Sequence, residues 1–245
     1  MRPCLGKSDN SSSRLDSGYH DLCTAIAEFD ERALTLSKPI FFDLDGTLTD
    51  PQQGITRCIQ FALEQLQQPV PDAQALTWCI GPPLHQSFVE LAGAELADQC
   101  VALYRQRFAR IGLYENQLYE GVPRLLSQLR NRGNDLFVAS SKPRVFVERI
   151  LEHFELTQYF SGVYGSELDG RLQDKGELLG HALAREGIVG SDSVMVGDRH
   201  HDALGAVENS MDFVGALYGF GSEDEFRGNG FHRWAQQPSE LLDLL

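Results

Sequence analysis

The stretch that decides the fold is Ile40-Phe41-Phe42-Asp43-Leu44-Asp45-Gly46-Thr47-Leu48-Thr49-Asp50. A short apolar run ends in two aspartates that are two residues apart, and a glycine follows them. If residues 40–44 form a strand, Asp43 and Asp45 lie on the same side, because side chains alternate between the faces of a strand. They then stand at the carboxyl end of the strand, where open α/β sheets bind ligands. One carboxylate there can serve as nucleophile or metal ligand, and the other as proton donor.

The composition is that of an ordinary globular protein. The chain has 245 residues, of which 42% are hydrophobic and 23% charged, and this length can bury one large core or two modest ones. No run approaches the roughly 20 apolar residues of a membrane span, and residues 1–17 lack the apolar core of a secretory signal. A formal net charge of -14 argues against a nucleic-acid or membrane partner, since no basic face is visible. An acidic protein that binds phosphate needs a local cation, which favours a bound divalent metal.

The cysteines indicate a reducing compartment. They are five in number and include no Cys-x-x-Cys pair: Cys4, Cys23, Cys58, Cys79 and Cys100. An odd count without metal-ligand spacing is typical of reduced, structural thiols and of neither a disulfide framework nor a zinc site. We therefore expect a cytoplasmic protein.

The chain divides into segments with different patterns of polar and apolar residues. Residues 1–37 contain a polar cluster without periodicity, and we expect a flexible extension with one short helix near residues 22–29. Residues 54–120 have a helical pattern broken by prolines, and no strand signal. Residues 38–53 and 121–245 alternate strands with helices, which predicts a parallel sheet covered on both faces. Because the helical segment lies between the first strand and the rest, it is expected to be a cap inserted over the strand ends.

The expected elements after Gly121 alternate regularly. In chain order they are a helix over 122–132, a strand over 136–139, a helix over 143–153, a weak strand over 162–165, a helix over 175–186, a strand over 193–196, a helix over 201–209 and a strand over 213–216. Beyond these, Gly219-Phe220-Gly221 predicts a loop and not a dinucleotide site, because it does not open a first βα unit.

Polar groups follow two further strands. The strand over 136–139 runs into Ser140-Ser141, where a hydroxyl and the following backbone N–H groups can hold a phosphate oxygen. The alternative for these serines is a plain helix cap. The strand over 193–196 is followed by Asp198, with Asp202 one helical turn later. Such carboxylates suit Mg²⁺, which prefers one or two of them together with water and phosphate oxygens, although Asp198 alone is also a suitable helix N-cap.

Lys175 begins a predicted helix. A lysine at a helix N-terminus is unfavourable for the helix dipole, so another reason for its presence is needed. Facing a phosphate and several aspartates would be such a reason. Lys142 is a rival for this position.

Four motifs together resemble those of the haloacid dehalogenase-like phosphohydrolases. They are Asp-x-Asp-Gly-Thr at 43–47, a serine after a strand at 140, a lysine at 175 and Gly-Asp-x-x-x-Asp at 197–202. The resemblance extends from residue 38 to the C-terminus and is closest to phosphoglycolate phosphatase-like members with a helical cap. It implies a Rossmann-like α/β core formed by 38–53 and 121–245, with 54–120 as an inserted all-helical cap.

The resemblance also implies roles for single residues. Asp43 is then the nucleophile that forms an aspartyl-phosphate. Asp45 is the general acid for the leaving oxygen and later the base for the hydrolytic water. Dehalogenases of this family lack an acid at the position of Asp45, so its presence argues for phosphoryl transfer.

The remaining implied groups hold the metal and the phosphate. The implied Mg²⁺ ligands are Asp43, the backbone carbonyl of Asp45, Asp198 and, as outer support, Asp202. The implied phosphate-binding residues are Ser140, Ser141 and Lys175, with Thr47 as a helper.

Three residues of the expected cap are candidates for substrate contact. Arg57 lies nearest the first motif in sequence and can reach a second anionic group of a substrate. Gly81 and Pro82 belong to a rigid loop that can dip into the site, as such cap loops do in similar proteins. A solvated arginine and a plain loop remain the alternatives.

The leading functional hypothesis is a Mg²⁺-dependent phosphatase acting on a small-molecule phosphomonoester, with phosphoglycolate and a 5'-nucleotide as candidates. The second is a phosphomutase of the β-phosphoglucomutase kind, which uses the same motifs but resists hydrolysis of its aspartyl-phosphate. The third is a catalytically idle relative that acts as a binding or regulatory module. The expected partner is a small phosphate ester, and the chain is expected to be a monomer or homodimer.

Overall fold

The computed structural model describes Met1 and residues 37–245. The expected flexible extension, its short helix near residues 22–29, Cys4 and Cys23 therefore lie outside the described residues. Within the described part, no helix is both long enough and apolar enough to cross a membrane.

The described chain alternates strands and helices after an early helical segment. In chain order the elements are β1 (Ile40–Phe42), β2 (Thr49–Asp50), α2 (Gln52–Gln65), η1 (Ala73–Cys79), α3 (Leu84–Ala92), α4 (Ala94–Phe108), η2 (Gly112–Tyr114), β3 (Gln117–Leu118), α5 (Val122–Asn131), β4 (Leu136–Pro143), α6 (Arg144–His153), η3 (Thr157–Tyr159), β5 (Gly162–Ser166), α7 (Lys175–Glu186), η4 (Gly190–Asp192), β6 (Val194–Gly197), α8 (His200–Glu208), β7 (Asp212–Ala216), α9 (Glu223–Gly228), β8 (Trp234–Ala235), η5 (Pro238–Glu240) and α10 (Leu241–Leu244).

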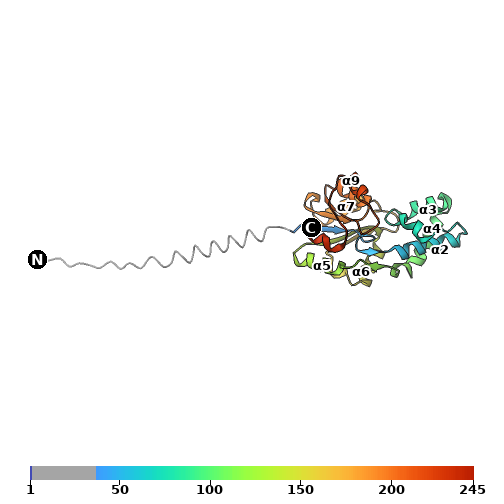
Figure 1. The fold of residues 1–245 in the computed structure, drawn as a ribbon, viewed down its shortest axis with the longest axis horizontal. Coiled ribbons are helices and arrows are strands. Elements are labelled where there is room, and N and C mark those ends of the chain that lie inside the picture. Colours follow the sequence, from blue (N-terminus) through green and yellow to red (C-terminus); the bar gives the residue numbers. More distant parts are fainter. Residues whose placement is uncertain (2–36) are drawn as a thin grey trace. The chain divides into compact units, whose positions relative to one another are not determined.

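The core is a parallel sheet with the strand order β5-β4-β1-β6-β7-β8. Helices cover both of its faces, with α5 and α6 on one side and α7 on the other (Figure 1). The α/β class expected from the alternation of elements is therefore confirmed. Because β1 is central and pairs with β4 and β6, the chain segments that follow these three strands emerge side by side.

The apolar run of β1 divides between two hydrophobic cores. Phe41 packs with Phe137 and Met195 against α7 and α8, and its ring stacks on that of Phe137 at 4.8 Å between centroids. Phe42 instead belongs to the core beneath α5 and α6. Consecutive side chains thus enter opposite faces, which explains why a strand buried on both sides has no polar residue in it.

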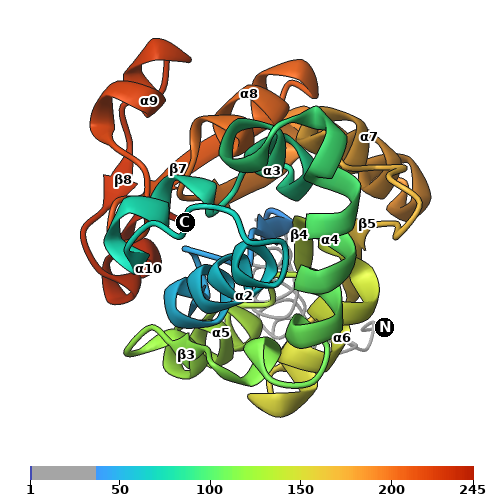
Figure 2. The ribbon, with the colours of Figure 1, turned by 90° about the vertical axis from the view of Figure 1, so that its right-hand side faces the viewer.

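The helices α2, α3 and α4 lie together at one end of the fold (Figures 1 and 2). They are inserted in the chain between β2 and β3, which pair antiparallel with Thr49 opposite Leu118. The expectation of no strand within residues 54–120 is wrong at β3. A strand of two residues is too short to leave an alternating pattern, and its pairing brings the entry and exit of the inserted helices together.

Several boundaries differ from expectation. β1 ends at Phe42 instead of Leu44, because the chain turns at once: the amides of Leu48 and Thr49 both donate to the carbonyl of Leu44. β4 extends to Pro143, so α6 begins at Arg144. The short elements α9, β8 and α10 were not foreseen, because each has six residues or fewer and so carries little periodicity.

We predict that Phe41→Ala lowers the free energy of unfolding by about 3–5 kcal/mol, because it removes a fully buried ring from a packed core. Urea denaturation followed by circular dichroism measures the change. Leu204→Ala on the surface of α8 is the control and should stay within about 0.5 kcal/mol of the wild type. Equal losses for both variants would contradict the assigned core.

Candidate active site

Charged side chains gather at the carboxyl ends of the three central strands. Asp43 directly follows β1 and Asp198 directly follows β6. Lys175 is the first residue of α7, and Asp202 lies in the first turn of α8. All four side chains are buried, so they face one another across a site from which protein excludes most water.

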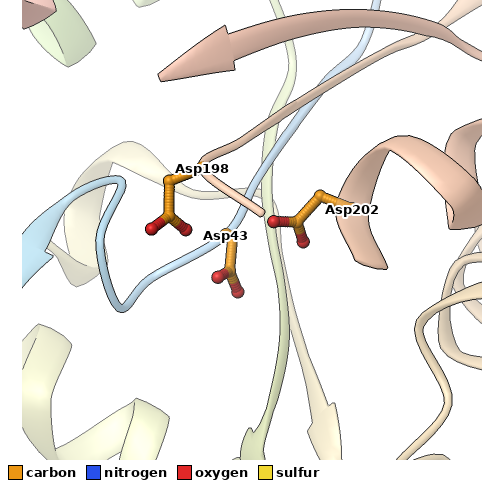
Figure 3. A group of neighbouring side chains, drawn as sticks. All are labelled: Asp43, Asp198 and Asp202. Atoms are coloured by element: carbon orange, nitrogen blue, oxygen red, sulfur yellow. The ribbon is translucent and has the colours of Figure 1, made fainter. Parts of the chain in front are cut away.

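Three aspartates form a compact cluster. Ligand oxygens of Asp43, Asp198 and Asp202 all lie within 4.8 Å of one another, and Figure 3 shows the three side chains next to one another. Buried like charges at this spacing repel one another strongly unless a cation lies among them. Carboxylate oxygens are hard ligands of the kind that small divalent cations prefer.

Lys175 is held among these carboxylates. Its Nζ donates to Asp43 Oδ1 at 3.0 Å and to the carbonyl of Ala139 at 2.8 Å, and it lies 2.7 Å from Asp202 Oδ1. Burial by itself would lower the pKa of Lys175, but the charges of Asp202 and Asp43 outweigh it and raise the pKa. The lysine is therefore a fixed positive charge at neutral pH.

Asp45 has a different cationic partner. It forms a buried ion pair with Lys142, whose Nζ lies 4.9 Å from the ring centroid of Phe108 in α4. Burial raises the pKa of Asp45, and the nearby charge of Asp43 adds to this, while Lys142 acts in the opposite direction. Lys142 and Lys175 are thus not rivals, because each serves its own carboxylate.

The balance of charge leaves room for a divalent cation. Four buried carboxylates face two buried ammonium groups, so the fully ionised site lacks two positive charges. Burial, Asp202 and Asp43 raise the pKa of Asp198 well above its usual range. Its Oδ1 is buried and has no hydrogen-bond partner among residues 37–245. A ligand oxygen without a partner, within a cluster short of two charges, fits a divalent metal.

The predicted phosphate-binding residues lie around the same point. Ser140 is buried near the end of β4 and accepts a hydrogen bond from the Lys142 amide at 3.4 Å. The carbonyl of Ser141 accepts from the hydroxyl of Ser166 at 2.8 Å. The hydroxyl of Thr47 is buried without a hydrogen-bond partner in the described part of the chain. Ser140 therefore lines the same cavity as Asp45, and the Thr47 hydroxyl is free to donate to a bound group.

A glycine-rich loop holds Asp198 in place. The amide of Phe220 donates to Asp198 Oδ2 at 2.8 Å. A Cβ at Gly219 would overlap the Asp198 side chain and the Gly46 carbonyl, and one at Gly221 would overlap the Asp198 carbonyl. Sequence reasoning predicted only a loop here. The signal that it missed is the pair of glycines just beyond a buried strand, where a backbone passes close to another.

A cavity of about 100 Å³ lies between Asp45 and the inserted helices. Its core side includes Ser140, Ser141 and Lys142. On the side of the inserted helices the lining is mostly apolar, and it consists of Ile55, Cys79, Gly81, Pro82, Pro83, Leu84, Tyr104, Arg105 and Phe108. The sequence predicts only helices in residues 54–120 and does not indicate that Tyr104 and Phe108 of α4 line this cavity, because nothing in it says which surface they meet.

The three residues that were candidates for substrate contact lie in different places. Gly81 and Pro82 line the cavity beside Asp45. Arg57 does not, because its side chain is half exposed and pairs with Glu115 at 2.8 Å. Glu115 also pairs with Arg107 at 2.7 Å, so this cluster ties η2 to the inserted helices on their outer surface.

Comparison with known proteins gives consistent similarities. A family model described as haloacid dehalogenase-like hydrolase matches residues 40–216. A 5'-nucleotidase of Pseudomonas aeruginosa is 50% identical over 192 residues, which are 78% of this chain and 87% of that protein. A crystal structure of a predicted phosphatase from Clostridium acetobutylicum superposes with a TM-score of 0.82 at 39% identity, covering 86% of this chain and 98% of that one. These similarities confirm the resemblance drawn from the four motifs.

A relative with a different name is also similar. The tyrosine-protein kinase PtkA of Mycobacterium tuberculosis is 38% identical over 185 residues. These residues are 76% of this chain but only 64% of that protein. The sequence similarity therefore extends to a protein that is named as a kinase.

We predict that Mg²⁺ stabilises the wild-type protein by about 2.7 kcal/mol at 100 times its dissociation constant. Asp198→Asn should abolish this gain, yet be at least as stable as the wild type without metal, because it relieves repulsion from Asp202 and Asp43. Urea denaturation with and without MgCl₂ measures both effects. The exposed change Asp169→Asn is the control and should keep the full gain. A gain that survives Asp198→Asn would contradict the proposed cluster.

We predict that Gly219→Ala destabilises the protein by about 1–3 kcal/mol, because the added methyl has no space, and that it also reduces stabilisation by Mg²⁺. The second effect follows because the methyl would displace the Asp198 carboxylate. Gly228→Ala is the matched control, since a Cβ there meets no atom of the described chain within 4 Å. Unfolding curves that show equal effects of Mg²⁺ on both variants would refute the role of the loop.

Proposed function

The chain belongs to the haloacid dehalogenase-like hydrolase family and is a phosphatase, and we propose that it hydrolyses a 5'-nucleotide-like phosphomonoester with Mg²⁺ through an aspartyl-phosphate. One observation carries the proposal: four buried carboxylates, the buried Lys175 and the largely buried Lys142 meet at the carboxyl ends of β1, β4 and β6. So many buried charges destabilise a fold unless they bind something charged. A divalent cation and a phosphoryl group are the partners that suit both signs.

Asp43 is the proposed nucleophile. Its Oδ1 is fixed by Lys175 at 3.0 Å, which leaves the other carboxylate oxygen to attack the phosphorus atom. The new Oδ–P bond forms as the ester P–O bond breaks, and the charge on the transferring group is offset by Lys175. Bound Mg²⁺, held by Asp43, the Asp45 carbonyl and Asp198 with Asp202 in support, would supply positive charge to the phosphoryl oxygens.

Asp45 is the proposed general acid and base. Burial raises its pKa, so the proton needed by the departing oxygen is available closer to neutral pH than in an exposed aspartate. In the second step the same carboxylate accepts a proton from the water that attacks the phosphorus of the aspartyl-phosphate. Inorganic phosphate leaves, and Asp43 returns to its carboxylate form. Ser140, Ser141 and Thr47 are the proposed hydrogen-bond donors to the phosphoryl oxygens.

The cavity beside Asp45 favours an uncharged leaving group with an apolar surface. Tyr104, Phe108 and Leu84 line it. Of the two cations in the lining, Lys142 is paired with Asp45 and Arg105 donates to the carbonyl of Leu168 at 3.2 Å. The carboxylate of phosphoglycolate would have to draw one of these cations from its present partner, whereas a nucleoside brings no charge. The relative that is 50% identical is named a 5'-nucleotidase, which supports the same choice.

The inserted helices are the proposed cap, spanning residues 54–120, over a core of 38–53 and 121–245. A cavity of about 100 Å³ is smaller than the roughly 150 Å³ that accommodates a benzene ring in an engineered protein cavity. A nucleoside therefore requires the cap to move outward, as lids do in many enzymes. We place the enzyme in the cytoplasm, which accords with the free, buried thiols of Cys58, Cys79 and Cys100.

We predict that Asp43→Asn lowers phosphate release by about four orders of magnitude or more, since removal of a nucleophile has effects of that size. The measurement is phosphate release from 5'-nucleotides, phosphoglycolate and an aryl phosphate, with and without Mg²⁺. Asp169→Asn is the control and should keep wild-type activity.

The same assays also distinguish the alternative substrates and functions. Greater kcat/KM for phosphoglycolate than for every nucleotide would overturn the proposed substrate class. Isomerisation of a sugar phosphate without phosphate release would indicate a mutase. Folded protein that binds Mg²⁺ but releases phosphate from no ester would refute the phosphatase itself and leave a binding role.

A further inference from the structure

We propose that Arg199 is a latch that holds the loop Ile80–Pro83 over Asp45 and thereby sets the size of the leaving group that the site admits. The residue does not line the cavity and acts through the loop, so it is a positioning residue. The inference deepens the proposed function and rests on it for its kinetic consequence, whereas the latch itself is a contact between two parts of the chain.

Arg199 joins three parts of the molecule. Its Nη1 donates to the carbonyl of Ile80, the first residue of the loop. Its Nε donates to Glu225 Oε2 in α9 at 3.3 Å, and its backbone amide donates to Asp202 Oδ2 at 3.1 Å. One largely buried residue thus connects the aspartate cluster, a surface helix of the core and the segment between η1 and α3.

The guanidinium group is what makes this connection possible. Its donors lie in a rigid planar fork, so it can hold two acceptors in fixed directions at once. Here those acceptors are the Glu225 carboxylate and the Ile80 carbonyl. The compact ammonium group of a lysine lacks this fork and does not hold two acceptors in the same fixed directions.

The loop connects the residue held by Arg199 to the wall of the cavity. Ile80 is fully buried, and Gly81 has a φ of +104°, a conformation that residues with side chains rarely adopt. The stem of Arg199 packs against this glycine, since a Cβ there would lie 3.1 Å from Arg199 Cγ. Pro82 and Pro83 follow and are stiff. Because Gly81, Pro82 and Pro83 all line the cavity, displacement of Ile80 displaces the cavity wall.

The cavity is small in the state in which the Arg199–Ile80 bond is formed, which is called the latched state. At about 100 Å³ it suits a leaving group of a few atoms better than a nucleoside, so release of the Arg199–Ile80 bond is expected to favour nucleotide entry. If the protein binds nucleotides only when the loop is open, its apparent affinity for them is reduced by the fraction of molecules that are open. Small esters that fit the latched cavity escape this penalty. Arg199 therefore governs the ratio of the two classes of substrate.

A second arginine provides a matched control. Arg149 in α6 donates to the carbonyl of Ala109 at 2.8 Å, at the end of α4. This is also an arginine–carbonyl bond between the core and the inserted helices, but neither residue lines the cavity. Arg149→Met removes a bond of the same kind without touching the loop.

The first experiment is hydrogen exchange of the full chain, without metal and without substrate. Arg199→Met should speed exchange of the amides of Ile80 and Gly81 by about tenfold, because a hydrogen bond to a charged group is lost. Arg149→Met should leave these amides unchanged, and Arg199→Lys should lie between Arg199→Met and the wild type. Unchanged exchange in Arg199→Met, or an equal increase throughout the chain, would overturn the latch.

The second experiment compares adenosine 5'-monophosphate with phosphoglycolate as substrates in the presence of Mg²⁺. Arg199→Met should lower KM for the nucleotide by up to about tenfold and should not lower it for phosphoglycolate, and Arg149→Met should change neither. Equal changes in KM for both esters would show that the substitution acts through the neighbouring Asp198 alone. That outcome would refute the role of Arg199 in specificity. If the wild type hydrolyses neither ester, the proposed function fails, while hydrogen exchange still decides whether the latch exists.

Discussion

The site depends on the concentration of negative charge at the carboxyl ends of the central strands. Four aspartates are buried there, and burial of like charges opposes folding unless cations compensate. Two lysines from different parts of the chain supply part of the compensation, one for Asp43 and Asp202 and one for Asp45. The hydrophobic cores on the two faces of the sheet hold these groups together, and the remaining imbalance of charge is what a metal and a phosphoryl group would complete.

The sequence was informative wherever local chemistry and strand order coincide. Asp43 and Asp198 each follow an apolar strand, and Ser140 lies in the last part of one, so a parallel sheet brings them to one edge whatever the details of packing. Lys175 was recognisable because a lysine is out of place at a helix N-terminus. For the same reason the fold class could be predicted, since it follows from the order of elements along the chain.

The remainder required contacts between distant residues. Lys142 was visible in the sequence, but its pairing with Asp45 depends on how β4 ends relative to β1. Arg199 and Ile80 are 119 positions apart, and the closeness of Gly219 to Gly46 likewise follows from the folded sheet alone. Arg57 was placed near the site by its position in sequence, yet a helix turns its side chain toward Glu115 on the outer surface. Position in the sequence therefore predicts well which residues lie at the end of a strand. It predicts poorly which way a side chain on a helix points.

The pairing of β2 with β3 has a mechanical consequence for the inserted helices. The chain crosses between sheet and helices twice, and at the crossing Thr49 and Asp50 pair in antiparallel register with Leu118 and Gln117. Two separate single-stranded tethers would let the helical layer twist, slide and tilt independently. A paired ribbon resists shear along its length and bends most readily across its flat face, so the layer is confined mainly to one swinging motion. Each swing would then carry the helices back along the same path and return the aromatic residues of α4 to the same register above Asp45.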